Sequence, residues 1–116
     1  MKPDDAIDIE EFIKAQYESM SEAQFQKIVE GYAKVMGWLY YHTRDSRRSQ
    51  PGFPDLVMLR GERQVVAELK RQKGAKPSEK QQNWLDGYKA VGAEVYVWRP
   101  AHIPEIEEIL KKVLRL

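Results

Sequence analysis

Two short apolar runs joined by a two-residue turn place the strongest constraint on how this 116-residue chain folds. Residues 56–59 and 64–70 are predicted to be strands, and Gly61-Glu62 between them favours an antiparallel hairpin. In such a hairpin the start of the first strand lies beside the end of the second. The sequence therefore predicts that positions near 55 and near 68–70 meet at one end of a sheet.

Helices and further strands surround the hairpin. Ser21 and Ser78 each precede a Gln by three residues, which is the spacing of a capping box at the start of a helix. The order of the elements predicts a single α/β domain over residues 1–116, with a central mixed sheet flanked by helices on both faces. Four aromatic residues are expected in its core: Trp84, Tyr88, Tyr96 and Trp98. Apolar spacing predicts helices over residues 6–18, 21–37, 78–92 and from 104 onward, and strands over 38–43 and 94–98.

The composition excludes several kinds of site. The chain has no cysteine and two histidines, which excludes disulfides, thiolate metal sites, cysteine nucleophiles and histidine-rich metal centres. No apolar run approaches the ~20 residues that span a membrane, and the first residues lack the apolar stretch of a signal peptide, so we expect a cytoplasmic protein. Catalysis by this chain must use carboxylates, lysine, hydroxyls or a metal bound through oxygen.

The net charge of +1 conceals an uneven distribution. Residues 1–30 hold three Lys against eight Asp or Glu, whereas residues 44–80 hold ten Lys or Arg against five Asp or Glu. A solvated surface would explain this pattern, and so would a face that binds the phosphates of DNA. On the second interpretation, the contacts come from two loop-like segments: Arg44, Arg47 and Arg48 in the first, and Arg71, Lys73 and Lys76 in the second.

Asp55, Glu68 and Lys70 form the group with the clearest chemical meaning. Glu68 and Lys70 point to one side of their strand, because side chains alternate along it, and the hairpin brings Asp55 beside them. Two carboxylates and an ammonium group at one point are suited to a Mg²⁺ site, since Mg²⁺ takes oxygen ligands and keeps several waters. The alternative is ordinary: an ion pair on the polar side of a strand, with Asp55 as a turn residue.

Five sequence segments, taken in order, resemble a known nuclease family. Residues 52–55 (Gly-Phe-Pro-Asp) and 67–70 (Ala-Glu-Leu-Lys) resemble the PD-(D/E)XK nuclease superfamily. Residues 78–85 (Ser-Glu-Lys-Gln-Gln-Asn-Trp-Leu) and 92–95 (Gly-Ala-Glu-Val) are similar to its VRR-NUC family, the virus-type replication-repair nucleases. Residues 21–26 (Ser-Glu-Ala-Gln-Phe-Gln) are similar to the pattern that opens a helix in that family.

This resemblance runs from Ser21 to Arg99 and implies a restriction-endonuclease-like fold. The nuclease core would occupy residues 21–100, between a helical extension (1–20) and a C-terminal helix (101–116). The resemblance also implies a Mg²⁺- or Mn²⁺-dependent DNA endonuclease of phage or bacterial type. Stand-alone members of this size are similar to Holliday-junction resolvases and act as homodimers. A nuclease with a flap, nick or end preference, a non-catalytic DNA-binding module and a restriction-type enzyme are the alternatives.

The resemblance also assigns roles to individual residues. It implies that Asp55 and Glu68 bind the metal together with the Leu69 carbonyl and Glu22, that Lys70 serves the attacking water, and that Gln81 approaches the site from its helix. Glu22 and Gln81 have structural alternatives. A carboxylate near a helix N-terminus is stabilising in itself, and Gln81 completes a capping box with Ser78.

Overall fold

The computed structural model of the chain describes residues 8–43 and 50–113. Every helix and strand expected from the sequence is present, in the expected order, and their bounds differ from the expected ones by a few residues. Residues 6 and 7, which were expected to open the first helix, lie outside the described part. The elements are α1 (Ile9–Ser19), α2 (Glu22–Val35), β1 (Leu39–His42), β2 (Leu56–Arg60), β3 (Arg63–Leu69), α3 (Glu79–Ala90), β4 (Glu94–Trp98), the 3-10 turn η2 (Pro100–His102) and α4 (Ile103–Lys111).

The four strands form one sheet in the order β1-β2-β3-β4. β1, β2 and β3 pair antiparallel, whereas β4 runs parallel to β3, so the sheet is mixed, as predicted. The β2–β3 hairpin is confirmed: Arg60 pairs with Arg63 across a turn in which Gly61 has a φ of 58°. Glycine adopts this conformation without the steric cost of a side chain. The parallel β3–β4 pair needs a crossover connection, and α3 supplies it.

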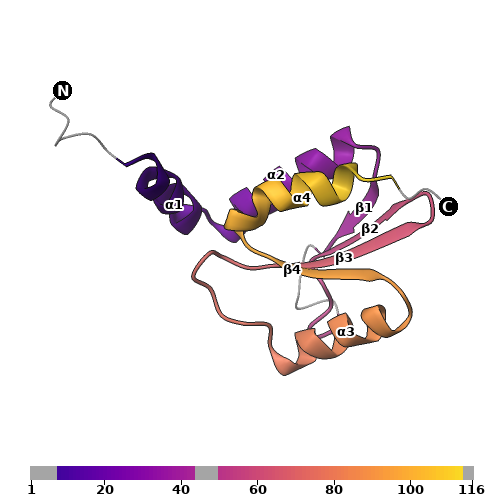
Figure 1. Ribbon diagram of the computed structural model, residues 1–116. Coiled ribbons are helices and arrows are strands. Elements are labelled where there is room, and N and C mark those ends of the chain that lie inside the picture. Colours follow the sequence, from indigo (N-terminus) through magenta and orange to yellow (C-terminus); the bar gives the residue numbers. More distant parts are fainter. Residues whose placement is uncertain (1–7, 44–49, 114–116) are drawn as a thin grey trace, which may run out of the picture.

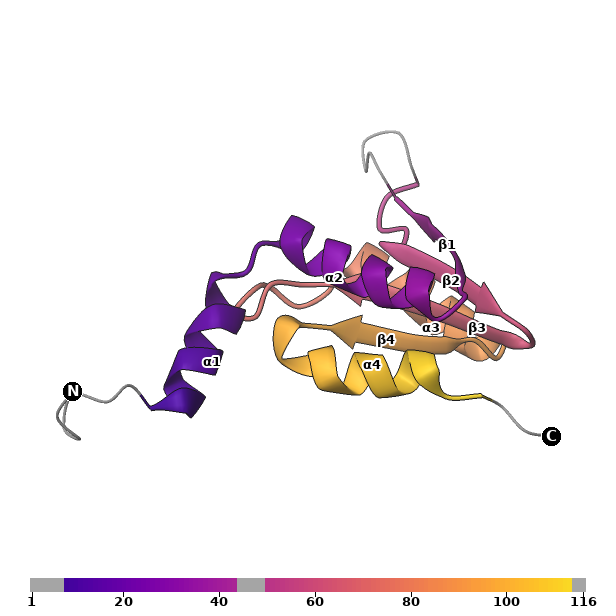
Figure 2. The ribbon, with the colours of Figure 1, turned by 90° about the horizontal axis from the view of Figure 1, so that it is seen from above.

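Helices cover both faces of the sheet, with α2 and α4 on one face and α3 on the other (Figure 1). Figure 2 shows α2 and α4 lying side by side over the strands, with α1 projecting away from them. Burying each of the larger apolar side chains under α2 and α4 stabilises the fold by about 1.5–3 kcal/mol. The core between these two helices and the sheet consists of Phe25, Val29, Ala33, Trp38, Leu56, Met58, Val65, Ala67, Leu69, Trp98, Ile106 and Leu110.

The opposite face of the sheet is covered less completely by α3. Leu85 is the residue that α3 buries, whereas Trp84 is exposed and Tyr88 is half-buried. The prediction that Trp84 lies in the core is therefore wrong, while Trp98 is buried as predicted. Successive residues of a helix are rotated by about 100°, so a helix that turns Leu85 towards the sheet turns Trp84 to the side.

Two arginines next to the β2–β3 turn connect the sheet to the end of α4. The Arg60 guanidinium donates to the carbonyl oxygen of Leu110 at 2.6 Å, and Arg63 donates two hydrogen bonds of 2.8 Å to the Glu94 carboxylate. Both guanidinium groups lie over the Trp38 ring, 4.7 and 5.0 Å from its centroid. The hydrogen bonds from Arg63 hold the pKa of Glu94 below its usual value, so this ion pair is formed at neutral pH.

None of the helices in the described ranges is both long and apolar enough to cross a lipid bilayer.

Candidate active site

The hairpin brings Asp55, Glu68 and Lys70 together at one end of the sheet. Asp55 directly precedes β2, Glu68 is the penultimate residue of β3, and Lys70 directly follows β3. The Asp55 carboxylate accepts a 2.7 Å hydrogen bond from the backbone N–H of Leu69 through Oδ2. This bond joins the two strands beyond their last ladder pair, Leu56 with Ala67. It also fixes the peptide that precedes the Leu69 carbonyl, a predicted metal ligand.

Gln81 connects this end of the sheet to the start of α3. Its side-chain oxygen accepts hydrogen bonds from the Lys70 ammonium at 3.0 Å and from the Ser78 backbone N–H at 2.8 Å. Its side-chain nitrogen donates to Oε1 of Glu68 over 3.4 Å, and its own backbone N–H donates to the Ser78 hydroxyl. The same side chain therefore completes the capping box and contacts both Lys70 and Glu68, and its role in catalysis stays a prediction.

Glu68 is the most strongly perturbed acid in the described part of the chain. Its side chain points to the α3 side of β3 and is 2% exposed. Burial, and secondarily the adjacent carboxylate of Asp55, raise the pKa of Glu68 to about 9. The Lys70 charge opposes this shift, and the negative charge of Glu22 adds to it. At neutral pH and without a cation, Glu68 is therefore held in its protonated form.

The environment of Glu68 fits a divalent cation. When Asp55 and Glu68 are both ionised they are only hydrogen-bond acceptors, and Glu68 Oε2 is then buried without a partner. Either a proton shared with Asp55 or a cation would satisfy this oxygen. Mg²⁺ and Mn²⁺ are suited to it, since both prefer carboxylate and carbonyl oxygens.

The ligand set that the described residues offer is small. Asp55 and Glu68 are the carboxylates that converge, whereas Glu22 lies on the exposed first turn of α2. The Leu69 carbonyl as a third ligand stays a prediction. In the described ranges, no group of three or more histidine, aspartate or glutamate side chains is arranged to hold a metal. The negative charge of the Glu22 carboxylate acts on the site electrostatically, because it raises the pKa of Glu68. Its role as a metal ligand stays a prediction.

Two further residues that were not predicted to do so, Thr43 and Gly52, position the Asp55 segment. The Thr43 backbone N–H donates to the carbonyl oxygen of Asp55 at 3.0 Å, and its hydroxyl donates to the carbonyl oxygen of Pro54 at 2.9 Å. Gly52 has a φ of 81°, and a Cβ atom there would lie 2.5 Å from the carbonyl carbon of Lys80. The Pro-Gly sequence signals a turn at Gly52, but no sequence signal marks Thr43.

The loop between β3 and α3 presents the second set of predicted DNA-binding residues. Arg71, Lys73 and Lys76 are all exposed on it, and Lys73 forms a 3.4 Å ion pair with Glu18 of α1. The Arg99 guanidinium stabilises the loop by donating hydrogen bonds to the backbone carbonyls of residues 71, 74 and 75. The loop therefore has a defined shape that leaves its own cationic side chains facing solvent. Arg44, Arg47 and Arg48 lie outside the described residues.

This mixed sheet, with a Pro-Asp and a Glu-x-Lys sequence converging at one end, defines an α/β domain of the nuclease type. The sequence profile of the VRR-NUC domain matches residues 7–101, so the chain belongs to the VRR-NUC family, a family of DNA-processing nucleases. A solved structure of a VRR-NUC domain shares the fold, with a TM-score of 0.62 and 21% identity over 75% of this chain and 94% of that one. No curated protein matches the chain.

Proposed function

We propose that this chain is a metal-dependent endonuclease that hydrolyses phosphodiester bonds in DNA with Mg²⁺ or Mn²⁺. The observation that carries the proposal is the pair formed by the half-buried carboxylate of Asp55 and the buried carboxylate of Glu68. Asp55 and Glu68 are adjacent, the Glu68 side chain is almost fully buried, and one of its oxygens has no partner among the described residues. A site that served only to stabilise the fold would leave neither a buried oxygen unpaired nor a second carboxylate beside it.

Asp55, Glu68 and the Leu69 carbonyl would hold the cation, which supplies polarisation of the phosphate and a more acidic bound water. The chain's own residues supply the geometry. The Leu69 N–H orients the Asp55 carboxylate, and Gln81 holds the Lys70 ammonium beside Glu68. From there Lys70 orients the attacking water and balances negative charge at the phosphate. The water oxygen loses a proton to solvent and bonds to phosphorus while one ester P–O bond breaks. The leaving oxygen takes up a proton from solvent, which leaves a phosphate end and a hydroxyl end.

For the substrate we propose branched DNA, in particular the four-way junction, cleaved by a homodimer in a bacterial or phage-infected cell. The support is the resemblance to junction-resolving enzymes and a symmetry argument. A dimer with two-fold symmetry presents two equivalent centres, which suits two equivalent strands of a junction. Arg71, Lys73 and Lys76 are exposed cations, and contacts from such side chains to phosphates position DNA without selecting its sequence.

Cleavage of end-labelled DNA tests the proposal directly. A four-way junction, a flap, a nicked duplex, a linear duplex and a single strand would be incubated with Mg²⁺, Mn²⁺ or a chelator. Lys70→Ala is the active-site variant, and Lys89→Ala, an exposed lysine in the last turn of α3, is its matched control. We expect paired cuts in the junction that require the metal, and a loss of at least about 100-fold in rate for Lys70→Ala alone.

Other outcomes separate the alternatives. Metal-dependent cleavage of flaps or ends with no preference for the junction keeps the chemistry and changes the substrate. Binding of DNA by the folded protein without any metal-dependent product would favour the non-catalytic module. Cleavage by Lys70→Ala at the wild-type rate would contradict the proposed role of the lysine.

A further inference from the structure

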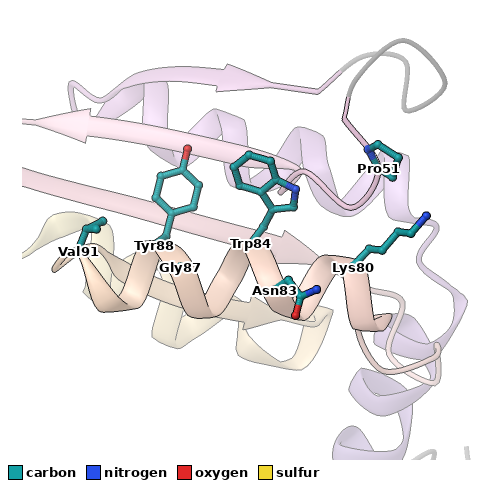
Figure 3. A pocket seen from close by; sticks show the side chains of 7 residues that line it. All are labelled: Pro51, Lys80, Asn83, Trp84, Gly87, Tyr88 and Val91. Carbon is teal, nitrogen blue, oxygen red and sulfur yellow. The ribbon is translucent and has the colours of Figure 1, made fainter.

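An open groove runs along α3 beside the candidate active site. Its volume is about 490 Å³, within the range of about 300–1,000 Å³ in which proteins bind drug-sized molecules. Figure 3 shows Trp84 and Tyr88 projecting from the same side of α3, with Pro51 opposite Lys80 at one end of the groove. The lining is completed by Asn83, Gly87 and Val91.

The groove begins at the end of the sheet that carries the two carboxylates. Lys80 lines it and directly precedes Gln81, whose side chain donates to Glu68. An α-helix rises about 1.5 Å per residue, so Trp84 and Tyr88 lie about 4.5 and 10.5 Å along α3 from Gln81. Stacked bases are about 3.4 Å apart along a strand. A DNA strand with one phosphate at the carboxylates therefore reaches both aromatic rings with its next few nucleotides.

Trp84 presents an open aromatic surface to this groove. It is 37% exposed, whereas the other two tryptophans, Trp38 and Trp98, are 4% and 3% exposed. The Phe53 ring packs edge-on against Trp84 with 5.0 Å between centroids, which restrains the orientation of the indole. The Trp84 and Tyr88 rings are inclined by 34°, with centroids 6.3 Å apart. Two rings held in similar orientations form a platform for the stacking of other flat rings.

We propose that this groove binds unpaired nucleotides of the DNA strand next to the cleaved phosphate. Trp84 and Tyr88 stack on the bases, and Lys80 contacts a phosphate. The inference rests on the proposed function, because it takes DNA as the ligand. Stacking on an aromatic side chain is worth about 5- to 150-fold in affinity per base and tolerates every base. Bases that are already unpaired enter such a site without the cost of leaving a duplex, which favours a branch point over a continuous duplex.

The lining of the groove fits unpaired bases better than paired DNA. Among the described residues, Lys80 is the one charged side chain that lines it, whereas duplex binding draws its affinity from many cations that contact phosphates. Exposed cations of that kind lie on the loop between β3 and α3 instead. Aromatic rings with a single cation match flat bases with one phosphate, so the groove selects the structure of the strand and not its sequence.

Gly87 offers a way to fill the groove without disturbing the fold. A Cβ atom at Gly87 would meet no other atom within 4 Å, and leucine favours a helix more than glycine does. Gly31 is the matched control: it is an exposed glycine of α2 whose Cβ would also meet nothing within 4 Å. Gly87→Leu and Gly31→Leu should therefore both melt at or above the wild-type temperature, and they differ in whether they fill the groove.

Fluorescence anisotropy of labelled DNA, with a chelator to prevent cleavage, tests the inference. The two probes are a blunt duplex and the same duplex with an unpaired thymidine tail. We expect the wild-type chain to bind the tailed duplex at least about fivefold more tightly than the blunt one. Gly87→Leu should abolish this preference and leave the affinity for the blunt duplex unchanged, whereas Gly31→Leu should keep the preference.

Trp84 provides an independent signal, because it is the exposed one of the three tryptophans. A thymine base stacked on its indole should quench the fluorescence of the wild-type chain when oligothymidylate is added. The quench should be absent in Gly87→Leu and in Trp84→Phe, which keeps a ring beside Phe53. It should persist in Gly31→Leu.

Three results would overturn the inference: equal affinity of the wild-type chain for the two duplexes, an unchanged preference in Gly87→Leu, or an equal loss of affinity for both duplexes in that variant. Cleavage assays with Mg²⁺ on the same samples keep the two proposals apart. A chain that prefers the tail and cuts nothing retains the groove and overturns the endonuclease proposal. A chain that cuts DNA without any preference for the tail does the reverse.

Discussion

The buried carboxyl of Glu68 allows a quantitative prediction about stability and pH. In the folded chain without metal, the pKa of Glu68 is raised to about 9 from an ordinary value of 4.5. Between these two values the folded state holds one proton that the unfolded state has lost. The stabilisation that this proton reflects is therefore complete below the unfolded pKa and is lost progressively as the pH rises towards 9.

The perturbation is Glu68→Gln, which keeps the shape of the side chain and removes its charge. One proton of difference corresponds to about 1.4 kcal/mol per pH unit. In the presence of a chelator, the wild-type chain should lose about 4 kcal/mol relative to Glu68→Gln between about pH 5 and pH 8. Subtracting the two curves removes the contributions of other groups that titrate in this range, the two histidines included.

Urea denaturation followed by tryptophan fluorescence measures both curves. The expected result is a difference between the proteins that grows in favour of Glu68→Gln as the pH rises. Excess Mg²⁺ should flatten the wild-type curve, because the cation displaces the proton, and should leave the variant unchanged. Parallel curves with chelator would refute the reasoning, because they would mean that Glu68 is ionised at neutral pH in the folded chain.

Three further perturbations test the turn before Asp55, the opposite end of the sheet and the loop between β3 and α3. Gly52→Ala should cost at least about 2 kcal/mol, because its φ is positive and its Cβ would meet the first turn of α3, and calorimetry would show a lowered melting temperature. Arg63→Ala should cost about 3 kcal/mol in urea denaturation, because it leaves the Glu94 carboxylate on β4 without its cationic partner and removes one of the two guanidinium donors to the Lys112 carbonyl; an unchanged midpoint would exclude this role. The double change Lys73→Ala, Lys76→Ala should weaken DNA binding and reduce the salt dependence of log K by up to about 2, and an unchanged salt slope would remove both lysines from the interface.

The sequence predicted those parts of the fold that local chemistry determines. The cap at Ser21 and the hairpin at Gly61 involve residues close together in the chain, and both are as expected. Because the hairpin register follows from the turn, the convergence of Asp55 with Glu68 could also be predicted. These inferences needed only the periods of helix and strand and the residues that turns require.

Features that depend on long-range packing could not be predicted in the same way. Trp84 was expected in the core, because its spacing with Leu85, Tyr88 and Val91 is that of a helix face. Spacing shows that residues share a face but does not show how much of that face the sheet covers, and of these four residues α3 buries Leu85 alone. The pairing of Arg99 with loop carbonyls more than twenty residues away likewise has no local signal.

Gln81 has a consequence for which substitutions this position tolerates. As the third residue of a helix, it satisfies its capping box equally well as glutamine or glutamate. Only glutamine also presents an N–H to Glu68 while its oxygen receives the Lys70 ammonium and the Ser78 N–H. A single base change in the codon, from glutamine to glutamate, would therefore preserve the helix while adding a third negative charge beside two carboxylates. The helix cap accepts glutamine or glutamate at this position, whereas the hydrogen bonds of the site require glutamine. Glutamine is therefore the residue that meets both requirements.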